Sequence, residues 1–414
     1  MATASLGGTG SVETRRSWLV AGSALGILSV SFGAPTITIV ALQPIAAAFG
    51  DARSVPALCS ALAWLGSSVG GIAMGQIAER VGVRWTVMFG ALMIATGLLL
   101  ASLGHRIDLY LGHGLFMGLL GNAGLNAPLY VYVARWFDRR RGTALALIAS
   151  GQAVAGTIWA PLFAHALPWI GWQRMMQVYA LFAVAVILPV AFLVFRRVPG
   201  VARAAGAPAE PAAGAPVLGL KPRTALGLLS LASFLCCVPM AMPQGHLVAF
   251  CSDVGIPLTQ GSAMLSLLLA CAFAGRQFWG FVADRYGGLR AVLAGSACQV
   301  TAMTGFLLTQ NEAGLFVVSA AFGLGFSGII PAYVLAIREL FPASEASWRV
   351  PTLLLCSGSG MAAGGWMAGA IYDHVGFYAA AFAAGILFNL ANLVVVGALV
   401  LRQSRFASPV LARA

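Results

Sequence analysis

A single basic residue, Arg276, lies inside an apolar stretch of the sequence, CAFAGRQFWG at positions 271–280. Its guanidinium stays protonated, and a charge at the centre of a membrane helix costs about 2.5–3.5 kcal/mol. None of the 12 acidic residues lies in the middle of an apolar stretch. Because a guanidinium can bind both oxygens of a carboxylate, we expect Arg276 to bind an anionic ligand. The alternatives are that the side chain extends to the membrane surface or bonds to backbone carbonyls.

Histidine and polar side chains in other apolar stretches could take part in the same site. His246 and His113 can titrate near neutral pH, so they are candidates for coupling proton movement to ligand binding. Each could equally be an interior histidine that hydrogen-bonds to a neighbouring helix. Six further polar residues could likewise either bind the ligand or form hydrogen bonds between helices. They are Asn122, Asn126, Tyr130, Gln152, Gln244 and Tyr333.

The segments that carry these residues are too apolar for a soluble protein. Of 414 residues, 60% are hydrophobic and 9% are charged, whereas soluble domains are about 45–50% apolar and about 25% charged. A membrane helix needs roughly 20 apolar residues. We therefore expect an all-α polytopic membrane protein with twelve transmembrane helices, near residues 18–43, 55–78, 85–103, 109–133, 143–165, 175–195, 225–250, 259–283, 290–309, 314–337, 351–371 and 377–401.

Basic residues divide unequally between the predicted loops. In a soluble protein the net charge of +12 would suggest nucleic acid as a partner. Here 20 of the 24 Lys and Arg residues fall on one side of the predicted membrane, and only Arg53, Arg106 and Arg174 fall on the other. The positive-inside rule then predicts that both termini are cytoplasmic, and the basic excess reflects topology rather than nucleic-acid binding.

The two halves of the sequence resemble each other. Residues 196–224 are rich in Ala, Gly and Pro, which predicts a cytoplasmic linker between six-helix halves at residues 1–195 and 225–414. The segment GQIAERVGVR at 75–84 recurs as GFVADRYGGLR at 280–290. Such a duplication, with the substrate site between the repeats, is typical of secondary transporters.

The repeated loop carries residues suited to a conformational switch. Gly75 and Gly280 are expected to permit close helix approach. Glu79 and Asp284 could form ion pairs that exist in one conformation and break in another. The alternative is that the loop charges only fix the topology. The candidate gating residues are Gly75, Glu79, Arg80, Arg84, Gly280, Asp284, Arg285 and Arg290.

The pattern Gly-x-x-x-Asp/Glu-Arg-x-Gly-x-Arg, present in both halves, resembles the signature loop of the major facilitator superfamily. Arg135-Trp136-Phe137, the run Arg139 to Gly142, and Ser150-Gly151-Gln152 resemble its monocarboxylate and oxalate–formate branch. The resemblance implies the major facilitator fold, two pseudo-symmetric six-helix halves around a central cavity. It also implies a substrate-related arginine at Arg276, whereas Ala272 stands where that branch often has an acid for proton coupling.

We therefore expect a secondary transporter that carries a small organic anion, a monocarboxylate, across a plasma membrane by proton symport or anion exchange. The alternative is an exporter of amphipathic drugs or metabolites, with Trp64, Trp159, Phe278, Trp279 and Trp366 as candidate cavity aromatics. A non-transporting membrane sensor is a more remote alternative.

Other kinds of function find little support in the sequence. The GxGxxG match at 323–328 lies inside an apolar segment with no preceding strand, so it does not predict dinucleotide binding. With no nucleophile or metal motif, we expect no enzymatic activity, no cofactor and no metal. The expected partners are the substrate, protons and the lipid bilayer, without nucleic acid, and we expect a monomer.

Overall fold

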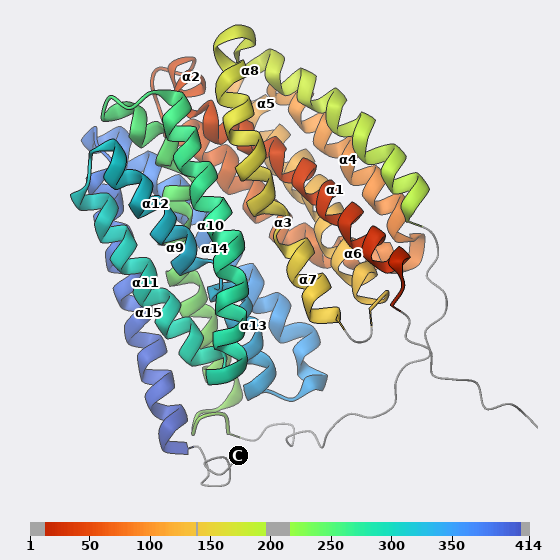
Figure 1. Ribbon diagram of the computed structural model, residues 1–414, viewed down its shortest axis with the longest axis vertical. Helices are drawn as coiled ribbons and strands as arrows, with labels where there is room; N and C mark the ends of the chain where they lie inside the picture. Colours follow the sequence, from red (N-terminus) through yellow and green to blue (C-terminus); the bar gives the residue numbers. More distant parts are fainter. Residues whose placement is uncertain (1–12, 138–139, 196–215, 407–414) are drawn as a thin grey trace, which may run out of the picture.

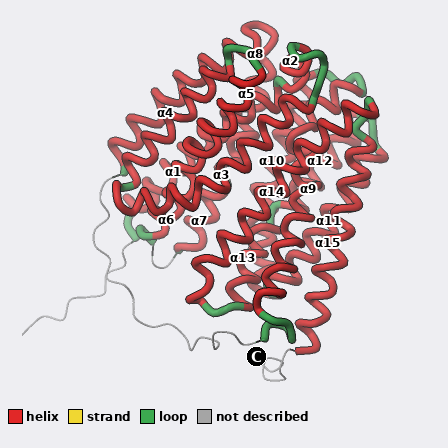
Figure 2. The backbone as a smooth tube through the Cα atoms, turned by 180° about the vertical axis from the view of Figure 1, so that it is seen from behind, coloured by secondary structure: helices red, strands yellow, loops and turns green. Residues whose placement is uncertain are grey.

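The computed structural model describes residues 13–137, 140–195 and 216–406. Within these ranges the chain forms helices joined by short turns, and no strand occurs among them (Figure 2). Most of the linker predicted at 196–224 lies outside the described residues, which resume at residue 216.

The helices form two groups that follow the order of the sequence (Figure 1). The first group, drawn from red to yellow, ends before the linker, and the second, drawn from green to blue, follows it. The first comprises α1 (Arg15–Val40), α2 (Leu42–Ala47), α3 (Ser54–Val81), α4 (Val83–Ala101), α5 (Arg106–Leu111), the π-helix η1 (Gly112–Asn122), α6 (Ala123–Ala134), α7 (Arg141–Ala149) and α8 (Gly151–Val194).

The second group has seven helices in the described part of the chain. They are α9 (Pro222–Asp253), α10 (Leu258–Tyr286), α11 (Gly288–Leu308), α12 (Glu312–Phe326), α13 (Ile329–Leu340), α14 (Ala343–Val375) and α15 (Ala379–Phe406). α1 begins and α15 ends at the same end of the bundle, whereas α2 lies at the opposite end (Figure 1). We call these the terminal end and the distal end.

The helices are long and apolar enough for a multi-pass membrane protein. Among the described residues, nine helical stretches can cross a membrane by length and composition. One of them, Gly142–Val194, is 53 residues long, which is enough for two crossings at roughly 20 residues each. With α5, η1 and α6 forming one continuous rod and α14 adding 33 residues, the elements are consistent with twelve crossings.

α8 changes direction at Gly171, between the segments predicted at 143–165 and 175–195. The φ angle of Gly171 is +72° and ψ is 164°, outside the helical region. Glycine adopts a positive φ without the steric penalty that a Cβ brings, and Pro168 precedes it by three residues. A single stretch of helix is thereby divided into two antiparallel arms.

The two groups of helices pack directly against each other through α3 with α14, α8 with α10, and α1 with α9. Small residues allow the closest of these contacts. A Cβ on Gly369 of α14 would lie 2.8 Å from the Ala57 Cβ and 2.9 Å from the Arg53 carbonyl oxygen of the α2–α3 region. Close packing through glycine and alanine stabilises contacts between membrane helices, because the hydrophobic effect does not drive helices together within lipid.

Candidate substrate cavity

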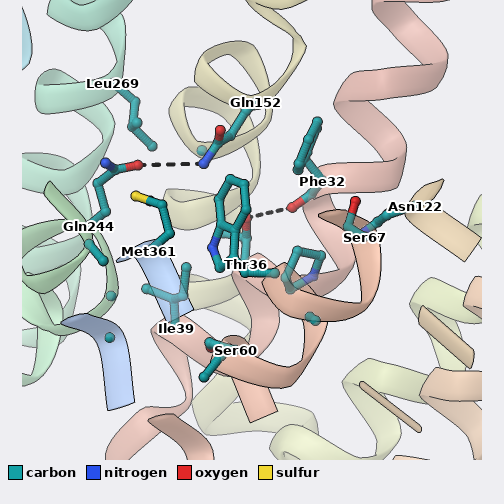
Figure 3. Close-up of a pocket in the computed structure, with 18 of the residues that line it drawn as sticks. Phe32, Thr36, Ile39, Ser60, Ser67, Asn122, Gln152, Gln244, Leu269 and Met361 are labelled. Atoms are coloured by element: carbon teal, nitrogen blue, oxygen red, sulfur yellow. Dashed lines mark hydrogen bonds between the residues drawn. The ribbon is translucent and has the colours of Figure 1, made fainter. Parts of the chain in front are cut away.

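A cavity with about 850 Å³ of empty space, part of it open to solvent, lies between the two groups of helices (Figure 3). Its lining comes from α1, α3, η1 and α8 on one side and from α9, α10 and α14 on the other. Both halves of the chain therefore contribute to one internal site.

Amide side chains from opposite halves meet at this cavity (Figure 3). Gln152 Nε2 on α8 donates to Gln244 Oε1 on α9 at 3.5 Å, and Gln244 Nε2 donates to the Met240 carbonyl at 3.0 Å. Near α1, Ser31 Oγ donates to Asn122 Oδ1 at 2.7 Å. A hydrogen bond of 3.5 Å is weak, so a ligand with its own acceptor can replace Gln244 as the partner of Gln152.

The remaining lining is largely apolar. Phe32 and Trp64 contribute aromatic faces, and Leu265, Leu269 and Met361 contribute aliphatic ones. Of the described residues that line the cavity, none carries a charge. A surface of this kind suits the apolar body of an organic molecule that is oriented by a few amide and hydroxyl groups.

The polar residues predicted for the substrate site separate into two sets. Asn122, Gln152 and Gln244 line the cavity. Tyr333 is buried within the second group of helices instead, and its hydroxyl donates to Asn392 Oδ1 at 2.9 Å. Asn126 and Tyr130 are half-buried on α6, one and two turns beyond Asn122 toward the terminal end, and they are not among the lining residues.

Arg276 lies on α10 toward the terminal end from the cavity. Its Cα is seven residues from the lining residue Leu269, or about 10 Å at 1.5 Å per residue. Its Nη1 donates to the Ala149 carbonyl at the end of α7, and its buried Nε has no hydrogen-bond partner. No carboxylate in the described part of the chain forms an ion pair with this guanidinium. Tyr130 from the other half interacts with it electrostatically.

Both candidate proton-coupling histidines are buried and make hydrogen bonds through both ring nitrogens. His113 Nε2 is 2.7 Å from Thr38 Oγ1, and its Nδ1 is 2.9 Å from the Leu109 carbonyl oxygen. His246 Nδ1 is 3.0 Å from the Tyr378 hydroxyl. Neither histidine lines the cavity, but Gly245, which precedes His246, does.

The repeated loops at the terminal end differ between the halves. In the first copy, Arg135 donates to Glu79 at 3.2 Å, and both side chains are more than half exposed. Arg84 Nε donates to the Phe195 carbonyl at 2.9 Å. In the second copy, Asp284 forms no ion pair with any described residue.

The remaining loop residues make few specific contacts. The guanidinium of Arg285 lies 5.8 Å from the ring centre of the adjacent Tyr286. Arg80 and Arg290 are exposed at the ends of α3 and α11.

The expectation of close helix approach at the loop glycines is wrong for Gly280. A Cβ at this position would meet no atom within 4 Å, and at Gly75 it would meet the Ala127 Cβ at 4.0 Å, an ordinary contact. In the second copy the close approach occurs at Gly288 instead, eight residues farther along at the start of α11. A Cβ at Gly288 would lie 2.5 Å from the Ala336 amide nitrogen.

A cluster of charged and aromatic residues joins the two halves at the distal end. Arg53, before α3, donates through Nη1 and Nη2 to the two oxygens of Asp253 at the end of α9, both at 2.5 Å. Its guanidinium carbon lies 3.6 Å from the ring centre of Tyr372 and 5.2 Å from that of Tyr378. The backbone amide of Arg53 also donates to Asp373 Oδ1 at 2.7 Å. We call Arg53, Asp253, Tyr372, Asp373 and Tyr378 the distal latch.

The latch keeps a buried charge in its ionised form. Arg53 is 7% exposed. Burial works against its charge, but the hydrogen bonds with Asp253 and Tyr378 prevail and hold the pKa of Arg53 above its ordinary value. The sequence placed Arg53, Asp253 and Asp373 only among the loop and span-end charges. The available signal was that one arginine and two aspartates stand at the ends of three predicted spans on the same side.

Comparison with known proteins agrees with this architecture. A model of the Major Facilitator Superfamily matches residues 23–250. An MFS-type transporter, pynF, from Aspergillus niger is 26% identical over 365 residues, which cover 84% of this chain and 80% of the relative. Monocarboxylate transporter 13 from Rattus norvegicus is 24% identical over 398 residues, which cover 91% of this chain and 87% of the relative.

The fold is also similar to solved structures. A bacterial homolog of the human lysosomal transporter Spinster, crystallised in an inward-facing and unoccupied conformation, superposes with a TM-score of 0.67. The superposition covers 95% of this chain and 96% of that protein at 16% sequence identity. Since the family model spans more than half of the sequence, the chain belongs to the major facilitator superfamily.

Proposed function

We propose that this chain carries a small organic anion, a monocarboxylate, across a membrane by alternating access. Its family membership makes it a multi-pass membrane transporter of a small molecule rather than an enzyme. The relatives include monocarboxylate transporters 13 and 11, each about a quarter identical to it. Within a family of many substrates, the choice of a monocarboxylate has to rest on the residues of the site.

The observation that carries the proposal is the half-buried side chain of Arg276 between the two halves, with its Nε fully buried. It donates to one backbone carbonyl, its Nε is unpartnered, and no described carboxylate balances its charge. Leaving a buried charged donor unsatisfied costs more than about 1–3 kcal/mol. A substrate carboxylate would supply both the missing acceptor and the missing negative charge. One positive charge matches one carboxylate, which favours a monoanion.

The cavity would hold the rest of the substrate. A carboxylate at Arg276 would direct an organic body toward Leu269, about 10 Å away along α10, in the cavity that Phe32 of α1 and Trp64 of α3 also line. The Gln152–Gln244 pair offers amide groups on the way. We therefore propose Asn122, Gln152 and Gln244 as substrate contacts, and Tyr130 as a neighbour of the carboxylate.

Alternating access requires closure at one end at a time. The distal latch joins the halves at one end, while the ion pair of Glu79 with Arg135 joins helices within one half at the other. We propose that the repeated loops close the terminal end when the latch opens. From the excess of basic residues we propose that the terminal end faces the cytoplasm, and we propose a plasma membrane as the location. Both proton symport and anion exchange fit this scheme, with His246 and His113 as titrating candidates.

A thermal-shift screen of the purified protein tests the substrate class. We expect small monocarboxylates to raise the melting temperature of the native protein and of an Arg174→Gln control, since Arg174 is an exposed arginine remote from the cavity. The Arg276→Gln variant should fold but lose that shift. Stabilisation of Arg276→Gln by monocarboxylates to the native extent would overturn the role of Arg276.

Transport of an amphipathic drug or metabolite is the second candidate, and the uncharged lining of the cavity favours it. Of the aromatic residues considered for such a cavity, Trp64 lines it, whereas Trp159 packs on Tyr179 within the first group of helices. Phe278 is 60% exposed and Trp366 is 46% exposed, and neither is among the lining residues. Stabilisation by amphipathic cations, unaffected by Arg276→Gln in the same screen, would select this function.

A further inference from the structure

An unbroken series of contacts runs from the cavity to the distal latch through His246. Gly365 on α14 lines the cavity, and its carbonyl oxygen is 2.8 Å from His246 Nε2. On the other side of the ring, His246 Nδ1 is 3.0 Å from the Tyr378 hydroxyl. The Tyr378 ring centre is in turn 5.2 Å from the Arg53 guanidinium. One imidazole therefore separates the substrate cavity from the residues that join the two halves.

The partners of His246 define its protonation state in the closed latch. A carbonyl oxygen can only accept, so Nε2 must carry the hydrogen that points at Gly365. In the neutral ring Nδ1 is then an acceptor, and the Tyr378 hydroxyl donates to it. This bond fixes the Tyr378 ring beside Arg53, where the negative face of an aromatic ring attracts a cation.

We propose that His246 is a positioning residue for the distal latch, acting through Tyr378, and that a proton on His246 opens the latch. The inference rests on the proposed alternating-access transport and adds a role for the proton in it. A protonated Nδ1 becomes a donor, so the Tyr378 hydroxyl has to accept from it and turn its own hydrogen away, while Arg53, which bonds to the same hydroxyl, offers no acceptor for that hydrogen. The new positive charge also faces Arg53, which is within electrostatic reach of the ring.

The other charges around the ring do not cancel this effect. Asp253 is occupied by both Nη atoms of Arg53 and by Gln43 Nε2 at 3.0 Å. Asp373 attracts a proton on His246, but its two oxygens accept the backbone amides of Arg53 and Ser54. Tyr372, the remaining titratable neighbour, packs on the Tyr378 ring with 4.7 Å between the ring centres. The carboxylates are thus already engaged by the first half.

Hydrogen–deuterium exchange of the intact protein in detergent tests this role without any substrate. Peptides that cover residues 43–60 and 246–256 report opening of the latch. After correction for the intrinsic effect of pH, we expect exchange in the native protein to be roughly tenfold faster at about pH 5 than at about pH 8. The His246→Gln variant, which cannot titrate, should show the same corrected exchange at both pH values.

Two control histidines and a second variant complete the experiment. His113→Gln alters a histidine that is equally buried but bonded within the first half, and His374→Gln removes an exposed histidine next to Asp373. Both should keep the native pH dependence. Tyr378→Phe keeps the ring but removes the hydroxyl, so it should lose the dependence even if His246→Gln fails to fold.

Two results would overturn the inference. One is exchange at the latch that is independent of pH in the native protein, and the other is native pH dependence in Tyr378→Phe. Because the readout needs no transported molecule, a failure of monocarboxylates to bind would leave this result unaffected and would count against the proposed substrate alone.

Discussion

The Arg53 guanidinium shows how a charge can be placed between two moving halves. A surface ion pair contributes little, because water and salt screen it. Arg53 and Asp253 have only 9% and 22% of their side chains exposed, and two aromatic rings cover the arginine. Removing one partner leaves the other charge in a poorly solvated position, which is strongly destabilising.

This argument predicts energetic coupling between Arg53 and Asp253. Asp253→Asn and Arg53→Gln should each destabilise the protein, and the double variant should cost less than their sum by about 1–3 kcal/mol. Equilibrium unfolding in mixed micelles measures the cycle. The exposed pair Glu79–Arg135 is the matched control, with a coupling below about 1 kcal/mol expected. Equal coupling in the two cycles would contradict a buried latch.

The Gln152–Gln244 pair supports a second prediction, about substrate affinity. Since its 3.5 Å hydrogen bond is weak, Gln152→Ala should leave the protein stable but raise the Kd for a monocarboxylate about three- to tenfold, the value of one hydrogen bond. Titration calorimetry measures the Kd. Gln177→Ala, which removes an amide bonded to Ser102 outside the cavity, should leave the Kd unchanged. An unchanged Kd in the Gln152→Ala variant would show that Gln152 does not contact the substrate.

Residue types in the sequence predicted part of this site. A polar residue in an apolar stretch is a visible signal, and Asn122, Gln152 and Gln244 do line the cavity. Tyr333 carries the same signal but bonds to Asn392 inside one half. Whether such a residue lines the cavity or lies inside one half depends on how its helix is rotated about its axis. A sequence without clear amphipathic faces does not reveal that rotation. The latch was missed because Asp253 and Asp373 lie 200 and 320 positions from Arg53 in the sequence.

Contact between α3 and α14 governs how closely the halves approach at the distal end. Gly369→Ala would force its Cβ against the Arg53 carbonyl at 2.9 Å, and backbone cannot move aside as a flexible side chain can. We therefore expect α14 to be displaced from the latch and exchange of residues 43–60 to accelerate several-fold. Gly22→Ala, whose Cβ meets no atom within 4 Å, is the control. Unchanged exchange in Gly369→Ala would show that the interface is looser than described.

Hydropathy predicted the elements better than it predicted their details. The segment predicted at 18–43 corresponds to α1 at Arg15–Val40, and the gap between 165 and 175 contains the turn at Gly171. The π-helix η1 was not foreseen, because its hydrogen-bond register leaves no mark in apolar composition. Its last residue, Asn122, faces the cavity, so this irregular stretch helps to present a polar side chain there.

At the scale of the whole molecule, the two halves enclose one cavity and are joined at one end by the distal latch. Composition and the internal repeat were sufficient to predict a helical membrane transporter, because both properties extend over the entire chain, and the resemblance of the repeated loop motif indicated this family. The substrate depends on a few side chains instead. Among them Arg276 stands apart as a half-buried cation between the halves, with a buried Nε, that no described carboxylate neutralises.

Uptake of radiolabelled monocarboxylate into proteoliposomes tests the central claim most directly. The native protein and Arg174→Gln should accumulate the anion at rates within about twofold of each other, whereas Arg276→Gln should be slower by at least about tenfold, the value of a charge-assisted hydrogen bond. Equal amounts of folded protein in each preparation make the comparison valid. Monocarboxylate uptake by Arg276→Gln at the native rate would contradict the account.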